Sequence, residues 1–291
     1  MRAWSIEGNR QRLDGGSMFG NAPRALWEQW LPPDGRNRIR LACRGLLVTG
    51  LNDRTVLFEV GPGAFFAPEL RERYGIDEDH STVPDSLTAC GVTEDDIDAV
   101  VLSHLHFDHA GGLLSDWRDG MNPTLRFPHA RYIVGQQSWN RAREPHKRDR
   151  ASFIPELQPL LEQSGRLELI TGSASTTLGD AVEFRYSDGH TPGLMLSIVG
   201  GDGGITYCAD LVPGRPWVHL PITMGFDRYP EQLIDEKEAF LAEMLERDIR
   251  LVFTHDPDCA LATLSRDERG RYGVTNEQAH FAALALPSPV A

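Results

Sequence analysis

The sequence predicts an α/β fold in which two mixed β-sheets pack face to face and helices cover their outer sides. Two observations support this prediction: short apolar strands precede helices in two successive blocks, and no internal repeat or low-complexity linker interrupts the 291 residues. The content of 41% hydrophobic and 24% charged residues is typical of a globular chain. We expect a single domain over residues 1–291, with an N-terminal loop and strand region at 1–37 and a core at about 38–280.

The first block begins in a region rich in glycine, proline and aromatic residues, for which we expect a strand start, an ordered loop and a short helix near 25–30. β-Branched and apolar residues at 38–49 and 55–60, separated by a turn, predict a hairpin. The remaining elements expected in this block are short helices at 86–91 and 93–96, strands at 99–103 and 131–134, and helices at 136–143 and 154–163.

The second block is predicted mainly as strands, at 167–170, 182–186, 195–199, 205–209 and 250–253. Residues 231–247 show apolar side chains at helical spacing among acids and bases, which predicts an amphipathic helix. Residues 262–265 and 272–274 are expected to close as a hairpin, and the tail after Leu286 carries no signal for regular structure.

The formal net charge of −13 disfavours a nucleic-acid partner, which would need a concentrated basic surface. The local exception is Arg141–Arg150, which we interpret as a solvated loop or helix end in preference to an anion-binding patch. No apolar run is long enough to span a bilayer, and the N-terminus lacks an apolar signal core. We therefore expect a cytoplasmic protein without a membrane partner.

Histidines and an aspartate gather directly after the strand predicted at 99–103. They form the stretch His104-Leu-His106-Phe-Asp108-His109. Alternate side chains of an extended segment share a face, so His104 and His106 can reach one metal, while the following turn directs Asp108 and His109 towards a second. Imidazole nitrogens and carboxylate oxygens suit zinc first, and also manganese, iron or cobalt.

This stretch resembles the HxHxDH signature of the metallo-β-lactamase superfamily, and the other segments of that family follow in order. Asp188–Gly193 is similar to the segment that carries the third histidine, Tyr207–Asp210 to the strand that ends in a bridging aspartate, and Phe253–Asp256 to the last histidine. The resemblance covers about 38–256. It implies the four-layer αββα sandwich of that family, and a hydrolase.

The resemblance also implies two divalent metal ions, most simply Zn²⁺. The ligands of the first ion would be His104, His106 and His190, and those of the second Asp108, His109 and His255, with Asp210 bridging both. Glu59 stands where the family has an aspartate that hydrogen-bonds a metal ligand without binding the metal itself, and we expect the longer side chain of Glu59 to support a ligand in the same way.

Within the superfamily, the stretch around His104 and the length of the chain are similar to the N-acyl-homoserine lactone lactonases. We therefore expect a small-molecule substrate, a lactone or ester attacked through a bridging hydroxide, with Asp108 either passing a proton to the leaving group or serving as a ligand only. Met18, Phe19 and Phe107 are candidate walls of a substrate pocket, although residues of these types more often serve simple packing.

One departure concerns the tyrosine that many such lactonases carry shortly after the bridging aspartate. Here Asp210 is followed by Leu-Val-Pro-Gly. His219, nearby in sequence, is a candidate to enter the site and donate a hydrogen bond or a proton; the alternative is a surface histidine.

Several other functions stay open from the sequence. A glyoxalase II-like thioesterase or a phosphotriesterase-type hydrolase would use the same ligands, and a metal-binding protein without turnover is the non-enzyme alternative. The aromatic N-terminal loop and the segment 139–153 are candidates for a homodimer surface or a lid.

Overall fold

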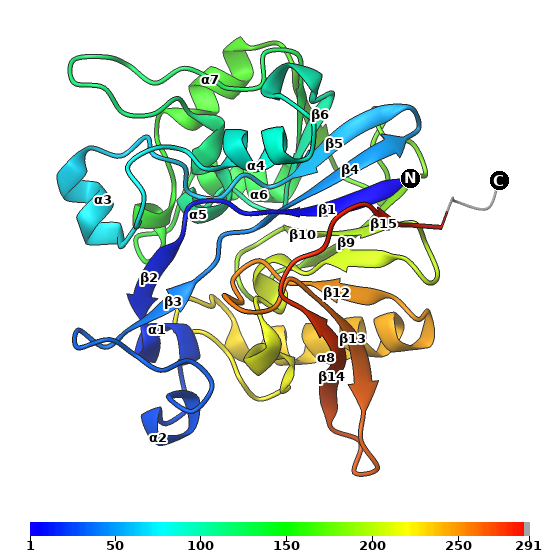
Figure 1. The fold of residues 1–291 in the computed structure, drawn as a ribbon. Coiled ribbons are helices and arrows are strands. Elements are labelled where there is room, and N and C mark those ends of the chain that lie inside the picture. The colour runs from blue at the N-terminus through cyan, green and yellow to red at the C-terminus, as the bar shows by residue number, and fades with distance from the viewer. Residues whose placement is uncertain (288–291) are drawn as a thin grey trace.

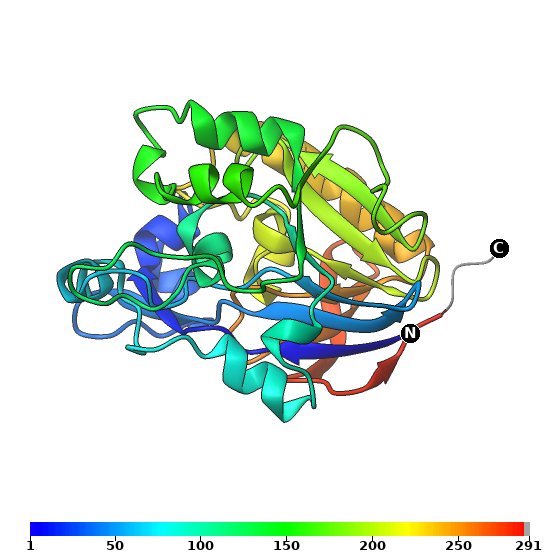
Figure 2. The ribbon, with the colours of Figure 1, turned by 90° about the horizontal axis from the view of Figure 1, so that it is seen from above.

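Two β-sheets pack against each other in the computed structural model, which describes residues 1–287, and helices cover their outer faces (Figure 1; Figure 2). This arrangement confirms the predicted α/β sandwich. Residues 288–291, which belong to the tail without a predicted element, lie outside the described residues. Within 1–287, no helix combines the length and the apolar character that crossing a membrane requires.

The first sheet has seven strands in the order β15-β1-β4-β5-β6-β7-β8. The pairs from β5 to β8 are parallel, and β15, β1, β4 and β5 pair antiparallel. The strands are β1 (Arg2–Ile6), β4 (Gly45–Leu51), β5 (Arg54–Phe58), β6 (Ala99–Leu102), β7 (Arg131–Gly135), β8 (Leu167–Ile170) and β15 (Leu284–Ala285). Because β1 and β15 belong to this sheet, the sheet extends beyond the expected core limits of 38 and 280.

The second sheet has six strands in the order β14-β13-β12-β11-β10-β9, and only its β11–β12 pair is parallel. Its strands are β9 (Val182–Ser187), β10 (Leu194–Val199), β11 (Ile205–Tyr207), β12 (Arg250–Val252), β13 (Leu261–Arg266) and β14 (Tyr272–Gln278). A separate antiparallel ribbon is formed by β2 (Gln11–Asp14) and β3 (Arg38–Leu41).

The helices are mostly short. They are α1 (Gly15–Phe19), α2 (Arg24–Trp27), α3 (Pro68–Tyr74), α4 (Val83–Ala89), α5 (Phe107–Ala110), α6 (Gln136–Arg143), α7 (Leu157–Gln163) and α8 (Pro230–Glu246). Single 3₁₀ turns occur at η1 (Glu94–Asp96), η2 (Gly111–Leu113), η3 (Arg150–Ser152), η4 (Ala209–Leu211) and η5 (Arg215–Val218).

Alternation along the first sheet separates two hydrophobic layers. On β6, Val101 joins the core between the sheets, while Val100 and Leu102 join the layer under α4, α6 and α7. On β7, Ile133 likewise joins the core between the sheets, and Val134 joins the layer under the helices. Successive side chains of a strand point to opposite faces, so these runs of consecutive apolar residues bury both faces of the sheet.

Helix α8 covers the second sheet on the side away from the first (Figure 1; Figure 2). Its apolar stripe includes Leu233, Phe240, Leu241 and Met244, which are buried against that sheet. A proline at the first helical position fits the start of the helix, because its missing N–H has no intrahelical partner there. The helix predicted at 231–247 is thus confirmed, displaced by one residue.

Candidate metal centre

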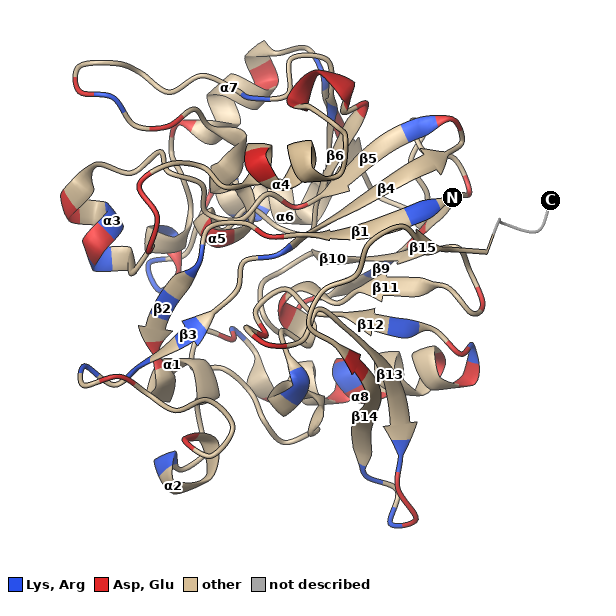
Figure 3. Cartoon of the chain, in the orientation of Figure 1, with Lys and Arg blue, Asp and Glu red and all other residues tan. Residues whose placement is uncertain are grey.

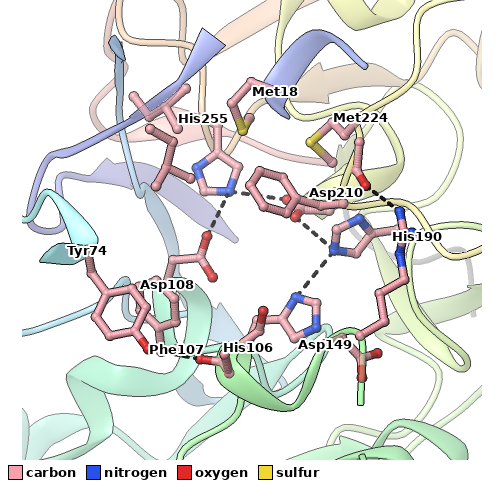
Figure 4. A pocket seen from close by; sticks show the side chains of 17 residues that line it. Met18, Tyr74, His106, Phe107, Asp108, Asp149, His190, Asp210, Met224 and His255 are labelled. Carbon is pink, nitrogen blue, oxygen red and sulfur yellow. Dashed lines mark hydrogen bonds and ion pairs between the residues drawn. The ribbon is translucent and has the colours of Figure 1, made fainter. Parts of the chain in front are cut away.

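The chain places its metal-binding residue types at one edge of the sandwich, beyond the carboxyl ends of several strands. His104 follows β6, Asp210 follows β11, and His255 follows β12. Asp108 and His109 lie on α5, and His190 lies in the turn between β9 and β10. The carboxyl ends of parallel strands meet at the same edge of a sheet, which brings together residues that are far apart in sequence. Figure 4 shows several of them around one cavity.

Three histidines form a first group of converging nitrogens: His104, His106 and His190. The Nδ1 atom of His106 lies 3.3 Å from Nε2 of His190. Nε2 of His104 is buried and has no hydrogen-bond partner among the described residues. Nε2 of His106 likewise has no partner among the described residues, and all three side chains are buried.

Asp108, His109 and His255 form a second group beside the first. Nε2 of His109 lies 3.3 Å from Nε2 of His255, and the carboxylate of Asp108 lies 3.8 Å from the latter atom. Nδ1 of His255 donates a 2.7 Å hydrogen bond to the carbonyl of Ala42. That bond fixes the tautomer of His255 and leaves a lone pair on its Nε2.

The carboxylate of Asp210 lies between the two groups. Its Oδ2 is 3.1 Å from Nε2 of His190, and its Oδ1 is 3.2 Å from Nε2 of His255 and 3.3 Å from Nε2 of His109. One oxygen therefore faces each group. Asp210 follows Ala209, whose φ of 42° turns the chain sharply after β11.

Glu59 lies behind both groups and contacts a residue of each. One carboxylate oxygen accepts a hydrogen bond from Nδ1 of His109, and the other accepts from the hydroxyl and the backbone N–H of Ser103. The Ser103 hydroxyl in turn accepts from Nδ1 of His104 at 2.9 Å. Glu59 is 1% exposed and has a φ of 58°. The structure thus places the glutamate behind the ligands, where the sequence predicts a supporting role.

A further supporting carboxylate, Asp227, was not among the candidate site residues. Its Oδ1 lies 2.9 Å from Nδ1 of His190, and its Oδ2 accepts from the backbone N–H of Met224. Asp227 is buried in the loop before α8. The only sequence signal for it is its place in the loop that follows His219, because no fixed spacing links this loop to His190.

The surroundings perturb the pKa values of these groups in opposite directions. Burial, followed by the neighbouring histidines, lowers the pKa values of His104 and His106 well below the ordinary value. Burial acts the same way on His109 and His255, but nearby carboxylates, above all Glu59 for His109 and Asp210 for His255, outweigh it and raise both pKa values. Burial also disfavours charge on Asp210, yet the surrounding histidines hold its pKa well below the usual range.

The donor set fits two divalent cations. Glu59, Ser103, Asp227 and Ala42 each accept from one ring nitrogen, so the opposite nitrogens of His109, His104, His190 and His255 point lone pairs inward. These lone pairs face the carboxylates of Asp108 and Asp210, and Oδ1 of Asp210 has no hydrogen-bond donor among the described residues. Inward-facing nitrogens and carboxylates in a buried site are well placed to hold divalent cations, and nitrogen with oxygen ligands suits zinc.

A cavity of about 350 Å³ opens above these residues (Figure 4). His106, Asp108, His190, Asp210 and His255 form its floor. Its walls are largely apolar and include Met18 and Phe107, two of the three candidate pocket residues. The other apolar or aromatic side chains of the wall are Leu13, Leu41, Tyr74, Met224 and Phe226.

Two candidate residues lie elsewhere, which corrects the sequence interpretation. Phe19 does not line the cavity; it is stacked between Trp27, at 5.6 Å, and Trp217, at 4.6 Å, in a separate aromatic core. His219 stacks on Trp30 and lines a different surface pocket with Tyr272 and Arg271. The turn η5 carries His219 away from the cavity, so proximity to Asp210 in sequence does not bring it to the site.

No tyrosine follows Asp210, but the cavity does contain one. Tyr74, at the end of α3, packs against Phe107 with ring centroids 4.6 Å apart, and its hydroxyl donates to the carbonyl of Ala151 at 3.3 Å. No motif in the sequence predicts this placement, because it depends on how α3 packs against α5.

Comparisons with known proteins agree with this arrangement. The family model of the metallo-beta-lactamase superfamily matches residues 41–255. A probable metal-dependent hydrolase from Staphylococcus aureus superposes with a TM-score of 0.82 at 24% identity, covering 94% of this chain and 96% of that chain. A structure of AidC, a dizinc quorum-quenching lactonase in complex with a product, gives a TM-score of 0.70 at 19% identity, covering 95% and 94%.

An N-acyl homoserine lactone hydrolase with N-hexanoyl-L-homoserine bound at its catalytic metal centre gives a TM-score of 0.63 at 18% identity, covering 88% of this chain and 93% of that chain. These likenesses agree with the sheet order and the helix layers described above. The family model spans most of the chain and includes all seven residues of the two groups and their bridge. The chain therefore belongs to the metallo-beta-lactamase superfamily and is a hydrolytic enzyme of that family.

Proposed function

We propose that the protein is a dinuclear metal hydrolase that opens a lactone or cleaves an ester bearing an apolar acyl group. The observation that carries this proposal is the position of the cavity: its floor is the cluster of histidines and aspartates, and its walls are mainly apolar. Such a pocket suits a substrate with one reactive carbonyl and a hydrocarbon portion.

The residues that would hold the ions are His104, His106 and His190 for the first and Asp108, His109 and His255 for the second, with Asp210 shared. Two divalent ions bound there, zinc most simply, would supply an acidified water and polarisation of the substrate carbonyl. Apart from the shared Asp210, the first position has three neutral imidazole nitrogens, whereas the second has two imidazole nitrogens and the carboxylate of Asp108. The two positions therefore differ in charge.

The side chains of the chain itself would perform the remaining tasks. Asp108 and Asp210 both line the cavity, and the side chain of Asp108 is the more exposed of the two, at 14% against 6%. We assign to Asp108 the transfer of a proton to the departing oxygen. Phe107, Met18 and Met224 would cover the acyl portion and exclude water from it.

Two structural neighbours narrow the substrate class by analogy. The dizinc lactonase and the N-acyl homoserine lactone hydrolase both hold N-hexanoyl-L-homoserine as product. The lactones that give such products combine a cyclic ester with a hydrocarbon chain, which is the combination that the cavity favours. We therefore place acylated lactones, the class to which N-acyl-homoserine lactones belong, first among the substrates.

A substrate panel on the zinc- or manganese-loaded protein tests this function. It compares acyl-homoserine lactones of several chain lengths, plain lactones, aryl esters, a thioester and paraoxon. Turnover of lactones or esters above the thioester and the phosphotriester is expected. Turnover of the thioester or the phosphotriester alone would move the assignment to those classes, and bound metal without any turnover would favour a metal-binding protein.

A variant separates metal-dependent turnover from background hydrolysis. His106→Ala removes a nitrogen that faces His190 at 3.3 Å, so both metal content and turnover are expected to fall sharply. Full activity in the variant would contradict the assignment of this residue.

A further inference from the structure

The basic segment Arg141–Arg150 lies along one wall of the cavity. Arg148 and Asp149 line the cavity together with Ala151 and Ser152, which follow directly in the chain. Figure 4 shows Asp149 next to His106, at the side of the first group of histidines. The sequence favours a solvated loop or a helix end for this segment, and Arg141 and Arg143 do lie in the last turn of α6. Arg148 is exposed, and together with Asp149 it also forms a boundary of the candidate active site.

Arg148 is the only lysine or arginine among the described residues that line this cavity. Its Nη2 donates a 2.7 Å hydrogen bond to the carbonyl of Gly225, in the loop on the facing wall. That contact holds the guanidinium at the cavity. No carboxylate in residues 1–287 forms an ion pair with Arg148, so its charge and its remaining N–H groups stay available to a ligand.

The neighbouring Asp149 does not serve as the counter-charge of Arg148. Its Oδ2 accepts from Nε of Arg141 at 3.0 Å and from Nη2 of the same residue at 2.5 Å. Nε of Arg228 lies 3.8 Å from the same oxygen. Arg141 and Arg228 thus share the one buried carboxylate of Asp149, which does not pair with Arg148.

Arg228 adds an independent sign of positive charge in this wall. Its side chain is 11% exposed, and its Nε and Nη1 are buried without a hydrogen-bond acceptor among the described residues. Behind Arg148 and Asp149, the guanidinium groups of Arg141 and Arg228 therefore face a single carboxylate, that of Asp149. In a protein with a net charge of −13, this group of residues carries a local excess of positive charge beside the cavity.

We propose that the substrate of this cavity carries a carboxylate at the end remote from the scissile carbonyl, and that Arg148 binds that carboxylate. This inference rests on the proposed hydrolase function and specifies its substrate class. A guanidinium presents N–H groups in a planar fork that matches a carboxylate. Met18, Phe107 and Met224 lie along the same cavity and would cover the methylene groups between the two ends.

Two esters of equal chain length test the inference: p-nitrophenyl hexanoate, which ends in a methyl group, and mono-p-nitrophenyl adipate, which ends in a carboxylate. The ratio of their kcat/KM values is measured for the metal-loaded wild-type protein and for Arg148→Gln, Arg148→Lys and Lys147→Gln. Lys147→Gln is the matched control, because it removes the same charge from an exposed neighbour that does not line the cavity.

The wild-type protein is expected to prefer the adipate ester. Arg148→Gln should lower the adipate-to-hexanoate ratio about tenfold or more, chiefly through KM for the adipate, since a charge-assisted hydrogen bond is lost. Arg148→Lys should restore part of the ratio, and Lys147→Gln should leave it within about twofold. An unchanged ratio in Arg148→Gln, or an equal fall in Lys147→Gln, would overturn the inference.

A binding measurement keeps the inference testable if no ester or lactone is turned over. Calorimetric titration with monomethyl adipate and with methyl hexanoate gives the ratio of their dissociation constants without any reaction. Tighter binding of monomethyl adipate that is lost in Arg148→Gln would support the carboxylate site even though the hydrolase proposal had failed. Equal binding of both probes in the wild-type protein would overturn it.

Discussion

Four of the five imidazoles at the candidate metal centre, those of His104, His109, His190 and His255, are oriented by a hydrogen-bond partner on the side away from the cluster. Glu59 accepts from His109 and, through Ser103, from His104, while Asp227 accepts from His190. Such partners fix the ring tautomer and make the inward nitrogen a better ligand. Glu59 is linked to His109 of the second group directly and to His104 of the first group through Ser103. A substitution of Glu59 is therefore expected to change the affinity of both positions for metal.

Replacement of Glu59 by glutamine tests this coupling. The amide keeps an acceptor oxygen but loses the negative charge, so the affinity for each metal ion is expected to fall about 10- to 100-fold. Calorimetric titration of the metal-free protein with zinc measures this change. Glu7→Gln is the control, since Glu7 is a half-exposed carboxylate that pairs with Arg44 away from the ligands. Unchanged zinc affinity in Glu59→Gln would contradict the role given to it.

At the residue scale, the sequence predicts those site residues that lie in short, recognisable motifs. The ligand candidates lie in recognisable segments at strand ends, and the structure brings all seven together. Asp227, Tyr74 and Arg148 reach the site through loops and a helix end whose paths depend on tertiary packing. Phe19 and His219 lie outside the cavity for the same reason: Phe19 packs between two tryptophans and His219 stacks on Trp30, and no short motif encodes these contacts.

The turn from β6 through α5 to η2 holds four of the ligands and needs glycine where it ends. A Cβ atom on Gly112 would overlap the carbonyl oxygen of Val60, and one on Gly111 would overlap that of Pro62. Both contacts are with backbone, which cannot move away as a side chain can. The Gly111-Gly112 pair therefore brings the ligand turn against the segment that follows Glu59.

We expect Gly112→Ala to lower the free energy of unfolding by about 1–3 kcal/mol through this overlap. Chemical denaturation of the metal-free protein measures the loss. Gly35→Ala is the matched control, because no atom lies near the position of its Cβ and its φ is not positive. A Gly112→Ala variant as stable as Gly35→Ala would mean that the backbone there is not as close as described.

Helix α8 carries a buried lysine within its apolar face. Lys237 is 0% exposed, and its Nζ donates to the carbonyls of Ile222 at 2.7 Å and His219 at 3.3 Å. Burial lowers its pKa to about 8, against a smaller opposing effect of Asp227. The lysine thus ties the helix to the loop that leads to Asp227, while carrying the cost of a buried charge.

The lowered pKa of Lys237 predicts a pH dependence of stability. Between about pH 8 and the ordinary lysine pKa of 10.5, the folded protein has released a proton that the unfolded chain still binds. The free energy of unfolding should therefore rise with pH across this window, by up to about 3 kcal/mol. Urea unfolding of the wild-type protein and Lys237→Met at several pH values measures the difference, and identical slopes for the two proteins would refute it.

At the element scale, apolar periodicity decided which segments could be predicted. Helix α8 and the strands β6 and β10 have strong apolar patterns and were found close to their observed limits. Helix α3 was missed because none of its residues is buried, so its sequence Pro-Glu-Leu-Arg-Glu-Arg-Tyr has no apolar stripe. Helix α1 was read as a loop because it is short and begins with two glycines.

The whole molecule is a sandwich whose one edge collects strand ends from both sheets. The prediction of two packed sheets followed from the order of strands and helices along the chain. The pairing of β1 with β15 was not predictable, since it joins segments at opposite ends of the sequence through few residues. The charge distribution is also a property of the whole molecule: Figure 3 shows acidic and basic residues interspersed along the chain.

The central claim is that Asp210 shares two metal ions between the two groups of ligands. The most direct measurement is the number of zinc equivalents that remain per chain after dialysis, determined by elemental analysis for the wild-type protein and for His255→Ala. The account predicts two equivalents for the wild type and one for the variant, which loses only the second position. A single equivalent in the wild type, or two retained in His255→Ala, would contradict it.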